Sequence, residues 1–341
     1  MNSLCEGCHV TEFEAIVKFF NNNEEALVFL RKHGVLPNTV TCPTCDKPCV
    51  LRKDRPTWQC NSKVSVPKTR KRKNCGFATP DYKGTFVEQC HFPVWKLVLF
   101  VNSWLRKRFT HEHVAQNLNL STQTTVNWRS YCSEVTEHFL ENQPPIGGPE
   151  VIVEIDESKF GKTKYGRGRA VKGIWVFGGI ERESKKSFLV PLLEDSRRNA
   201  DTLIPLIQQY ILPGSVIISD EWAAYRNLKE YGYKHLAVNH SKNFVKPKDP
   251  EGDTQQIEVH TQNIERLWED VKSWVLKAGI RKEYYRQYFG RYLFLRKSGT
   301  NHQELLHSFF LAAAELYPPQ GERKKEEGPP PPPSSSDSDD E

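Results

Sequence analysis

Hydrophobic positions along the chain follow two different rhythms. In the first half, FEAIVKFF, NEEALVFLRKHG and residues 92–141 repeat apolar residues with the spacing of amphipathic helices, and Gly34 marks a helix end. In the second half, VIVEID, GIWVFGGIE and SFLVPLL are short apolar runs that predict a meander of three strands. They are followed by a predicted helix (ADTLIPLIQQYI), a buried strand (SVIISD), a helix (WAAYRNLKEYG), a short strand (HLAVNH) and a helix after VHTQN. This order indicates a mixed α/β sheet.

Changes in this pattern predict six segments. NQPPIGGPE is rich in Pro and Gly and is typical of a linker, and the Pro-rich acidic end has almost nothing to bury. The predicted segments are an N-terminal helical segment (1–36), a cysteine-bearing module (37–80), a helical domain (81–141), the linker (142–150), an α/β domain (151–317) and a disordered tail (318–341).

Charge adds a class of partner to this picture. The 341-residue chain has a net charge of +6, and because its tail is acidic the rest is more basic than that figure. Such a balance suits a polyanion such as nucleic acid. The most apolar segment, FPVWKLVLFVNSWL, is interrupted by Lys96 and Asn102, and the first twenty residues lack the pattern of a secretion signal. We therefore expect an intracellular protein without membrane contact.

Four cysteines in the second segment have the spacing of a zinc site. Cys42-Pro-Thr-Cys45 places two thiolates on one tight turn, which is half of a tetrahedral site. Cys60 and Cys75 are the expected second half, although a long basic insertion separates them, and Cys49 remains the alternative ligand. Because residues 40–80 contain few apolar residues, we expect structural Zn²⁺ to replace a hydrophobic core there.

The basic insertion itself, KTRKRK, supplies Arg70, Lys71, Arg72 and Lys73. These residues are candidates for phosphate contact or for a nuclear import signal, and a solvated loop is the structural alternative.

A helix-turn-helix is predicted within FTHEHVAQNLNLSTQTTVNWRSYCSEV at 109–135. The first helix should run through Leu118, and Ser121 or Thr122 should cap the second. The second helix would present Gln123, Asn127 and Arg129 to DNA. Helical hairpins with polar faces are common, so an ordinary helix pair is the alternative.

Two aspartates interrupt the apolar strands. Asp156 follows VIVEI and Asp220 closes SVIIS, and a carboxylate at the edge of a buried strand is costly unless it is paired or bound to a cation. Side by side in a sheet, the two would suit a divalent metal, with Glu265 of the last helix as a third ligand. The alternative is that both aspartates merely cap strand ends.

Four stretches, in order, carry a family resemblance: EIDESKFGKTKYGRGRAVKGIWVFGGIER, PGSVIISDEWAAYRNL, GYKHLAVNHSKNFV and VHTQNIERLWEDVK. With them the chain resembles, over residues 36–300, the transposases of the Merlin group of DNA transposons and their bacterial insertion-sequence relatives. The resemblance implies a ribonuclease-H-like domain at 151–317 that follows a zinc ribbon and a helical DNA-binding segment. It also implies that Asp156, Asp220 and Glu265 are catalytic and bind two Mg²⁺ or Mn²⁺ ions.

The reaction implied is phosphodiester hydrolysis at transposon ends, followed by attack of the freed 3′-hydroxyl on target DNA. By family analogy the partners are transposon-end and target DNA and a second copy of the chain, and we expect the protein in the nucleus. Basic residues near the acids are further candidates for DNA contact, namely Lys159, Lys162, Lys164, Arg167, Arg169 and Lys272. The alternative hypothesis is a domesticated derivative that binds nuclear DNA without strand transfer.

Overall fold

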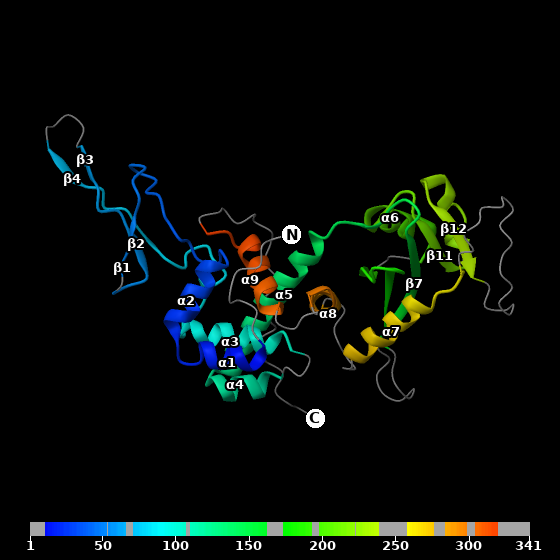
Figure 1. Cartoon of the computed structure of the whole chain (residues 1–341), viewed down its shortest axis with the longest axis horizontal. Coiled ribbons are helices and arrows are strands. Elements are labelled where there is room, and N and C mark those ends of the chain that lie inside the picture. Colours follow the sequence, from blue (N-terminus) through cyan, green and yellow to red (C-terminus); the bar gives the residue numbers. More distant parts are fainter. Residues whose placement is uncertain are drawn as a thin grey trace, which may run out of the picture. The chain divides into compact units, whose positions relative to one another are not determined.

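The structure is a computed structural model, and it describes residues 11–52, 54–65, 71–106, 110–161, 173–192, 198–221, 223–238, 258–275, 284–298 and 304–319. The chain forms two compact units, one built mainly of Ile16–Leu99 and the other mainly of Phe100–Ala312 (Figure 1). The first contains the predicted zinc ligands, and the second contains the predicted catalytic acids. In the described ranges, no helix has both the length and the apolar character needed to cross a membrane.

The predicted N-terminal helices are confirmed. Asn22 caps the second of them by accepting the backbone N–H of Glu25, and Gly34 follows that helix with φ 72°, a left-handed conformation that ends helices. The helices before residue 105 are α1 (Glu12–Phe19), α2 (Asn23–Lys32) and α3 (Val94–Trp104).

The cysteine-bearing segment is made of short strands. Three of them form an antiparallel sheet in the order β1-β2-β5, and a separate hairpin pairs β3 with β4. Trp58, at the centre of the sheet, packs with Val40 and the cysteines as a small core. The strands are β1 (Val50–Arg52), β2 (Thr57–Gln59), β3 (Lys63–Ser65), β4 (Arg72–Asn74) and β5 (Ala78–Pro80).

The helical part of the second unit follows the sequence prediction closely. Thr110 and Ser121 cap consecutive helices through their hydroxyl groups, and Asn119 turns the chain between them in the left-handed conformation. A later helix packs along the longer of the two, with Phe139 against Phe294. These helices are α4 (His111–Leu118), α5 (Thr122–Glu141), α8 (Tyr285–Ser298) and α9 (Leu305–Leu316).

A five-stranded mixed sheet forms the core of the second unit, in the order β12-β11-β7-β8-β9. The first three strands along the chain are the predicted antiparallel meander, whereas β11 runs parallel to both β7 and β12. The mixed α/β class is therefore confirmed. The strands are β7 (Ile152–Phe160), β8 (Ile174–Glu181), β9 (Ser187–Leu192), β11 (Val216–Asp220) and β12 (Lys234–Val238).

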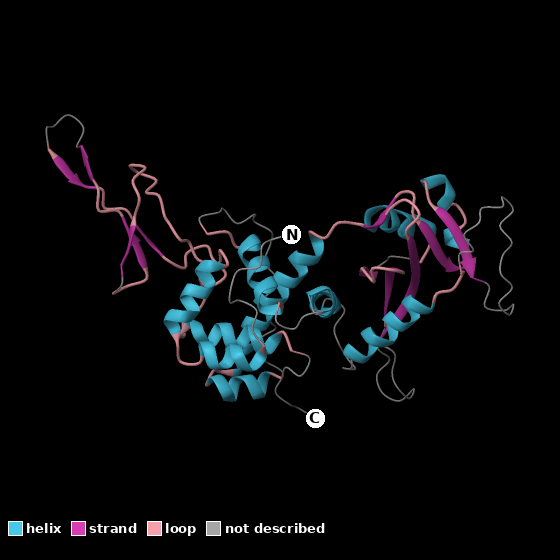
Figure 2. Cartoon of the chain, in the orientation of Figure 1, coloured by secondary structure: helices cyan, strands magenta, loops and turns pink. Residues whose placement is uncertain are grey.

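Helices cover both faces of this sheet (Figure 2). One face packs Ile155 and Ile217 against α6 (Ala200–Tyr210), and the other packs Val176 and Ile180 against α7 (Gln262–Trp274) and α8. The central strands β7, β8 and β11 are mostly buried, which explains their largely apolar sequences, whereas every residue of the edge strand β12 is exposed or half-buried.

Three local expectations need correction. The stretch WAAYRNLKEYG is not one helix: it forms two short 3₁₀ turns, Ala223–Tyr225 and Leu228–Tyr231, and Leu228 buries its side chain in the core. The predicted linker contains β6 (Ile146–Gly147), which pairs in parallel with β10 (Ile211–Leu212). Asp156 lies in the middle of β7, so a strand-end cap does not explain it.

Candidate active site and metal centre

Strand register places the two predicted aspartates next to each other. In the parallel pair β7 and β11, Glu154 lies opposite Ile218. Asp156 and Asp220 each follow two residues later, so the same register sets them side by side, and side chains two residues apart point to the same face of a sheet. The sheet thus brings together acids that are 64 positions apart in the sequence.

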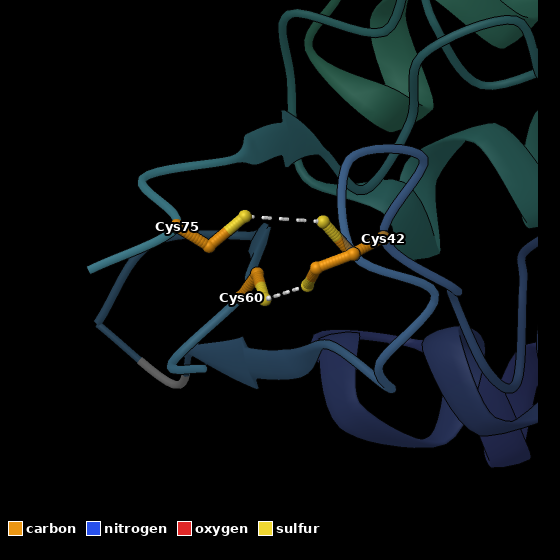
Figure 3. Close-up of side chains that lie close together, drawn as sticks. Cys42, Cys60 and Cys75 are labelled. Atoms are coloured by element: carbon orange, nitrogen blue, oxygen red, sulfur yellow. Dashed lines mark hydrogen bonds between the residues drawn. The ribbon is translucent and has the colours of Figure 1, made fainter. Parts of the chain in front are cut away.

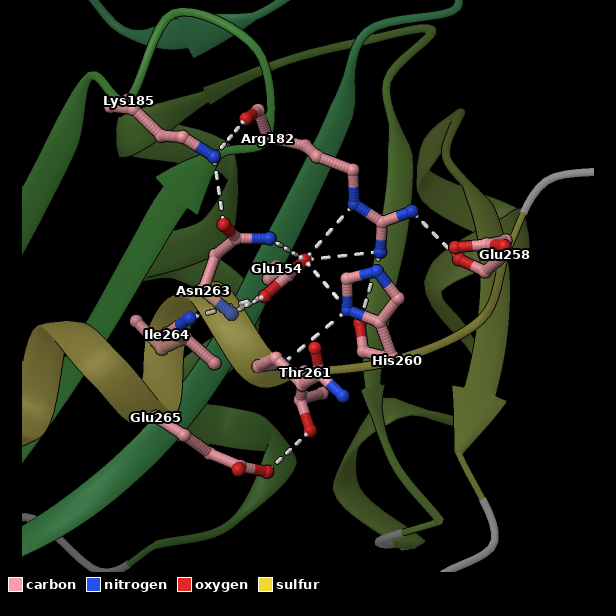
Figure 4. Close-up of polar contacts among 10 residues, drawn as sticks. Glu154, Arg182, Lys185, Glu258, His260, Thr261, Asn263, Ile264 and Glu265 are labelled. Carbon is pink, nitrogen blue, oxygen red and sulfur yellow. Dashed lines mark hydrogen bonds and ion pairs between the residues drawn. The ribbon is translucent and has the colours of Figure 1, made fainter. Parts of the chain in front are cut away.

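Helix α7 brings the third acid to the same face. Trp268 of α7 donates its indole N–H to Oδ2 of Asp156 at 3.0 Å. Glu265 precedes Trp268 by three residues, which in a helix places both on one side, and its Oε1 accepts the Thr261 hydroxyl at 2.9 Å. Glu265 itself is exposed to solvent (Figure 4).

The three acids influence one another electrostatically. Burial raises the pKa of Asp156 above its usual value, and the negative charges of Asp220 and Glu265 raise it further. The backbone N–H of Glu157 and the indole of Trp268 oppose this shift. Mutual repulsion among acids on one half-buried face is what a divalent cation would relieve, so the donor set fits a hard metal ion.

Two further acids on β7 escaped the sequence analysis. Glu157 faces the α6 side, where the Tyr225 hydroxyl donates to it and Arg198 pairs with it at 3.8 Å. Burial raises the pKa of Glu157 to about 7. Glu154 is fully buried and bonds the start of α7. For Glu154, its position inside the apolar run VIVEI was the available signal, because a buried carboxylate needs partners.

The four predicted zinc ligands lie together in the first unit. The sulfurs of Cys42, Cys45, Cys60 and Cys75 all lie within 4.8 Å of one another. Among the described residues, these four form the group of side chains that could together hold a metal ion. The Cys42–Cys75 and Cys45–Cys60 sulfurs are each 3.5 Å apart (Figure 3). Zinc–sulfur bonds of about 2.3 Å in a tetrahedron place sulfurs about 3.8 Å apart, so the cluster has the size of a zinc site. Cys49 lies beside this group but outside it.

Hydrogen bonds from backbone N–H groups favour the thiolate form of these four cysteines. Each thiol accepts an N–H from the residue two positions later, the donors being Thr44, Lys47, Ser62 and Phe77. Burial opposes ionisation of Cys42, but the Thr44 N–H and the neighbouring thiols of Cys75 and Cys45 outweigh it and lower its pKa to about 6. Cys45 then resists ionisation despite its Lys47 N–H, because burial and the neighbouring sulfurs raise its pKa to about 12. A bound cation would remove this competition.

The predicted DNA contacts lie in several environments. Lys71, Arg72 and Lys73 are exposed on or beside β4, and Gln123 bonds Asn127 on the exposed face of α5 at 2.8 Å. Arg129 is half-buried, with its guanidinium over Tyr288, while Lys159 lies over Trp175 and Lys272 over Phe160. The remaining candidates lie outside the described residues: Arg70, Lys162, Lys164, Arg167 and Arg169. DNA contact at all of these positions stays a prediction.

Comparison with known proteins finds a family match for part of the second unit. Residues 141–294 match the family described as the ISXO2-like transposase domain. This span contains Asp156, Asp220 and Glu265. The resemblance to transposases predicted from the sequence is thereby confirmed over residues 141–294.

Other similar proteins are more distant. Male abnormal protein mab-31 of Caenorhabditis elegans is 23% identical over 250 residues, which are 67% of this chain and 56% of that protein. The chain thus spans little more than half the length of this relative. Among solved structures, the simian T-cell lymphotropic virus intasome in complex with PP2A regulatory subunit B56 gamma has 13% identity and a TM-score of 0.27, covering 54% of this chain and 64% of that one. The Mos1 transposase paired-end complex with left transposon end has 12% identity and a TM-score of 0.22, covering 62% and 78%. Both TM-scores are too low to establish a shared fold.

Proposed function

We propose that this protein is a divalent-metal-dependent DNA transposase with Asp156, Asp220 and Glu265 as its catalytic acids. The observation that carries the proposal is the convergence of these acids on the α7 face of the sheet, inside the matched domain. Two Mg²⁺ or Mn²⁺ ions held there would activate the attacking oxygen and stabilise the leaving oxygen.

The roles of the chain's own groups follow from their positions. β7 and β11 fix the aspartates in register, and the Trp268 indole orients the carboxylate of Asp156. Thr261 orients Glu265 from the turn below it. In the reaction, a water oxygen would attack the scissile phosphorus while the bond to the 3′-oxygen of the transposon end breaks. That 3′-hydroxyl would then attack a phosphorus of the target DNA and form a new phosphodiester, while the bond from that phosphorus to the target strand's own 3′-oxygen breaks and leaves a target 3′-hydroxyl.

We infer a ribonuclease-H-like fold for the domain at 151–317. The antiparallel meander β7-β8-β9, followed by β11 and β12 parallel to β7, supports it. In the remainder of the chain, Zn²⁺ at the four cysteines would stabilise the β1-β2-β5 sheet, and α4 and α5 would act as a helix-turn-helix on DNA. A homo-oligomer that holds two transposon ends and a nuclear location complete the proposal.

Cleavage of DNA tests the enzymatic role. The full chain is incubated with Mn²⁺ and DNA carrying candidate terminal inverted repeats, beside Asp156→Asn and Glu265→Gln. The matched control is Glu269→Gln, the same substitution at another exposed acid of α7, one turn or about 6 Å further along the helix. We expect cleavage by the unmodified chain and the control only. Cleavage by Glu265→Gln at the control's rate would refute the assignment of this acid.

A second candidate is a domesticated DNA-binding protein without strand transfer. It is favoured by the relative mab-31, whose name describes an abnormal male and not a transposase. Inverted repeats and a short target duplication flanking the coding sequence would decide for the mobile element. Specific binding of such DNA without cleavage in Mn²⁺ or Mg²⁺ would decide for the domesticated protein.

A further inference from the structure

The carboxylate of Glu154 is the centre of a buried polar network between β7 and α7 (Figure 4). The residue is 0% exposed and lies two positions before Asp156, on the same face of the strand. Its Oε1 accepts Nε of Arg182 at 3.0 Å and Nδ2 of Asn263 at 2.7 Å. Its Oε2 accepts the backbone N–H groups of Asn263 at 2.8 Å and Ile264 at 3.1 Å. His260 Nδ1 lies 3.5 Å from Oε1.

These bonds replace the usual cap of α7. The first N–H groups of a helix have no partner within it, and a side chain at the position before the helix normally accepts one of them. Thr261 occupies that position but accepts no N–H of the helix, and its hydroxyl donates to Glu265. Glu154 caps the helix from the neighbouring strand instead, and a negative charge at a helix start is favourable.

Arg182 and Lys185 fasten the segment that leads into α7. Both belong to the turn between β8 and β9. Arg182 donates to the carbonyl oxygens of Glu258 at 2.7 Å and His260 at 3.0 Å, while Lys185 donates to Oδ1 of Asn263 at 2.7 Å. The start of α7 is therefore held from two sides, by a strand carboxylate and by a cationic turn.

We propose that Glu154 is a positioning residue that sets where α7 presents Glu265 relative to Asp156. This inference rests on the proposed function, since it concerns the same three acids. Glu154 and Asp156 lie on one rigid strand, and Glu265 follows Ile264 directly. Through Glu154, the strand that carries the first ligand also fixes the turn that carries the third. Partners that orient metal ligands typically contribute about 10- to 100-fold to metal affinity or activity.

The decisive variant is Glu154→Gln, which keeps the shape of the side chain but removes its charge. Glu181→Gln is the matched control: this acid is also buried on the neighbouring strand, but the groups it accepts are the N–H of Gly147 and the Ser184 hydroxyl, neither of which belongs to α7. Mn²⁺ affinity is measured by electron paramagnetic resonance, and hydrogen exchange of the α7 amides by mass spectrometry. We expect Glu154→Gln to weaken Mn²⁺ binding about tenfold and to speed exchange in the first turn of α7, whereas Glu181→Gln changes neither.

A milder pair keeps the test decisive if Glu154→Gln does not fold. Asn263→Ala removes one bond to Glu154, and Gln262→Ala alters an exposed neighbour in the same turn. We expect only Asn263→Ala to weaken Mn²⁺ binding. Wild-type affinity in both Glu154→Gln and Asn263→Ala, or an equal loss in either variant and its control, would overturn the positioning role. Failure of the unmodified chain to bind Mn²⁺ would refute the proposed function, and faster α7 exchange in Glu154→Gln would then show only that Glu154 holds the helix.

Discussion

The close contact between Gly178 and Trp268 gives the sharpest prediction. Gly178 lies on β8 opposite Asp156 in register, and the Trp268 ring packs directly over it. A Cβ at this position would meet Cη2 of Trp268 at 2.7 Å and Cζ2 at 2.9 Å. Ordinary contact begins at 3.4 Å, so in Gly178→Ala the ring has to retreat by roughly 0.7 Å. Nε1 of Trp268 now lies 3.0 Å from Oδ2 of Asp156. After this retreat, the distance between the two atoms would exceed that of a hydrogen bond.

Two magnitudes follow from this displacement. Overpacking a tight core costs about 1–3 kcal/mol, and about 2–4 °C of melting temperature is lost per kcal/mol in a domain of this size, so we expect a decrease of roughly 2–12 °C. Loss of the donor that orients Asp156 should weaken Mn²⁺ binding by about tenfold or more. Thermal unfolding followed by tryptophan fluorescence measures the first effect, and electron paramagnetic resonance measures the second.

Gly179→Ala is the control for this experiment. Its Cβ would meet Cε1 of Phe188 at 2.5 Å, an equally severe clash on the opposite face of the same strand. We expect Gly179→Ala to lose comparable stability while keeping its affinity for Mn²⁺. Equal loss of affinity in both variants would show that general loosening of the sheet weakens the site, and that the Trp268 contact has no special role.

Three other predictions concern the zinc site, a buried acid and the basic hairpin. Cys42→Ser should abolish stoichiometric zinc and expose the β1-β2-β5 sheet to protease, whereas Cys49→Ser should retain one zinc by metal analysis; zinc retained in Cys42→Ser would contradict the ligand set. Burial raises the pKa of Glu137 to about 7 from 4.5. Between these two pH values the folded chain keeps the proton that the unfolded chain loses, so the free energy of unfolding falls as the pH rises from 4.5 to about 7. Glu137→Gln should therefore be more stable than the unmodified chain at pH 8, by up to about 3 kcal/mol, and similar to it at pH 4, with urea titrations at both pH values as the check. Replacing Lys71, Arg72 and Lys73 by Ala should flatten the salt dependence of DNA binding by about 0.9 in logarithmic slope per lost phosphate contact, and an unchanged slope would exclude this hairpin from the interface.

The sheet could be predicted because its central strands are mostly buried on both faces. Val153, Ile155, Val176 and Ile180 give continuous apolar runs that a surface strand would not show, and the acids stand out against them. The ends of α4 and α5 were predictable for a local reason: Thr110, Asn119 and Ser121 act within their own turns. Helix caps of this kind depend only on residues that are close in the sequence.

Features that depend on distant partners were not predictable. WAAYRNLKEYG has helical spacing, yet Tyr225 bonds Glu157, 68 residues away, and Leu228 enters the sheet core, so the segment forms two 3₁₀ turns. The bonding role of Glu154 was missed, because its partners Arg182 and Asn263 follow 28 and 109 residues later in the chain. The sequence indicated that a buried acid needs compensation but not which group supplies it.

The three acids on β7 differ in how their charge is compensated, and this difference supports the proposed metal site. Glu154 has the guanidinium of Arg182, and Glu157 has Arg198 and the Tyr225 hydroxyl. Asp156, between them, has the indole N–H of Trp268 and the backbone N–H of Glu157, and among the described residues no Lys, Arg or His forms an ion pair with it. Its other charged influences, Asp220 and Glu265, are negative. Burying a charge without a counter-charge is costly, and protein groups supply that compensation for Glu154 and Glu157. At Asp156, which lies near Asp220 and Glu265, the proposed metal ions would supply it.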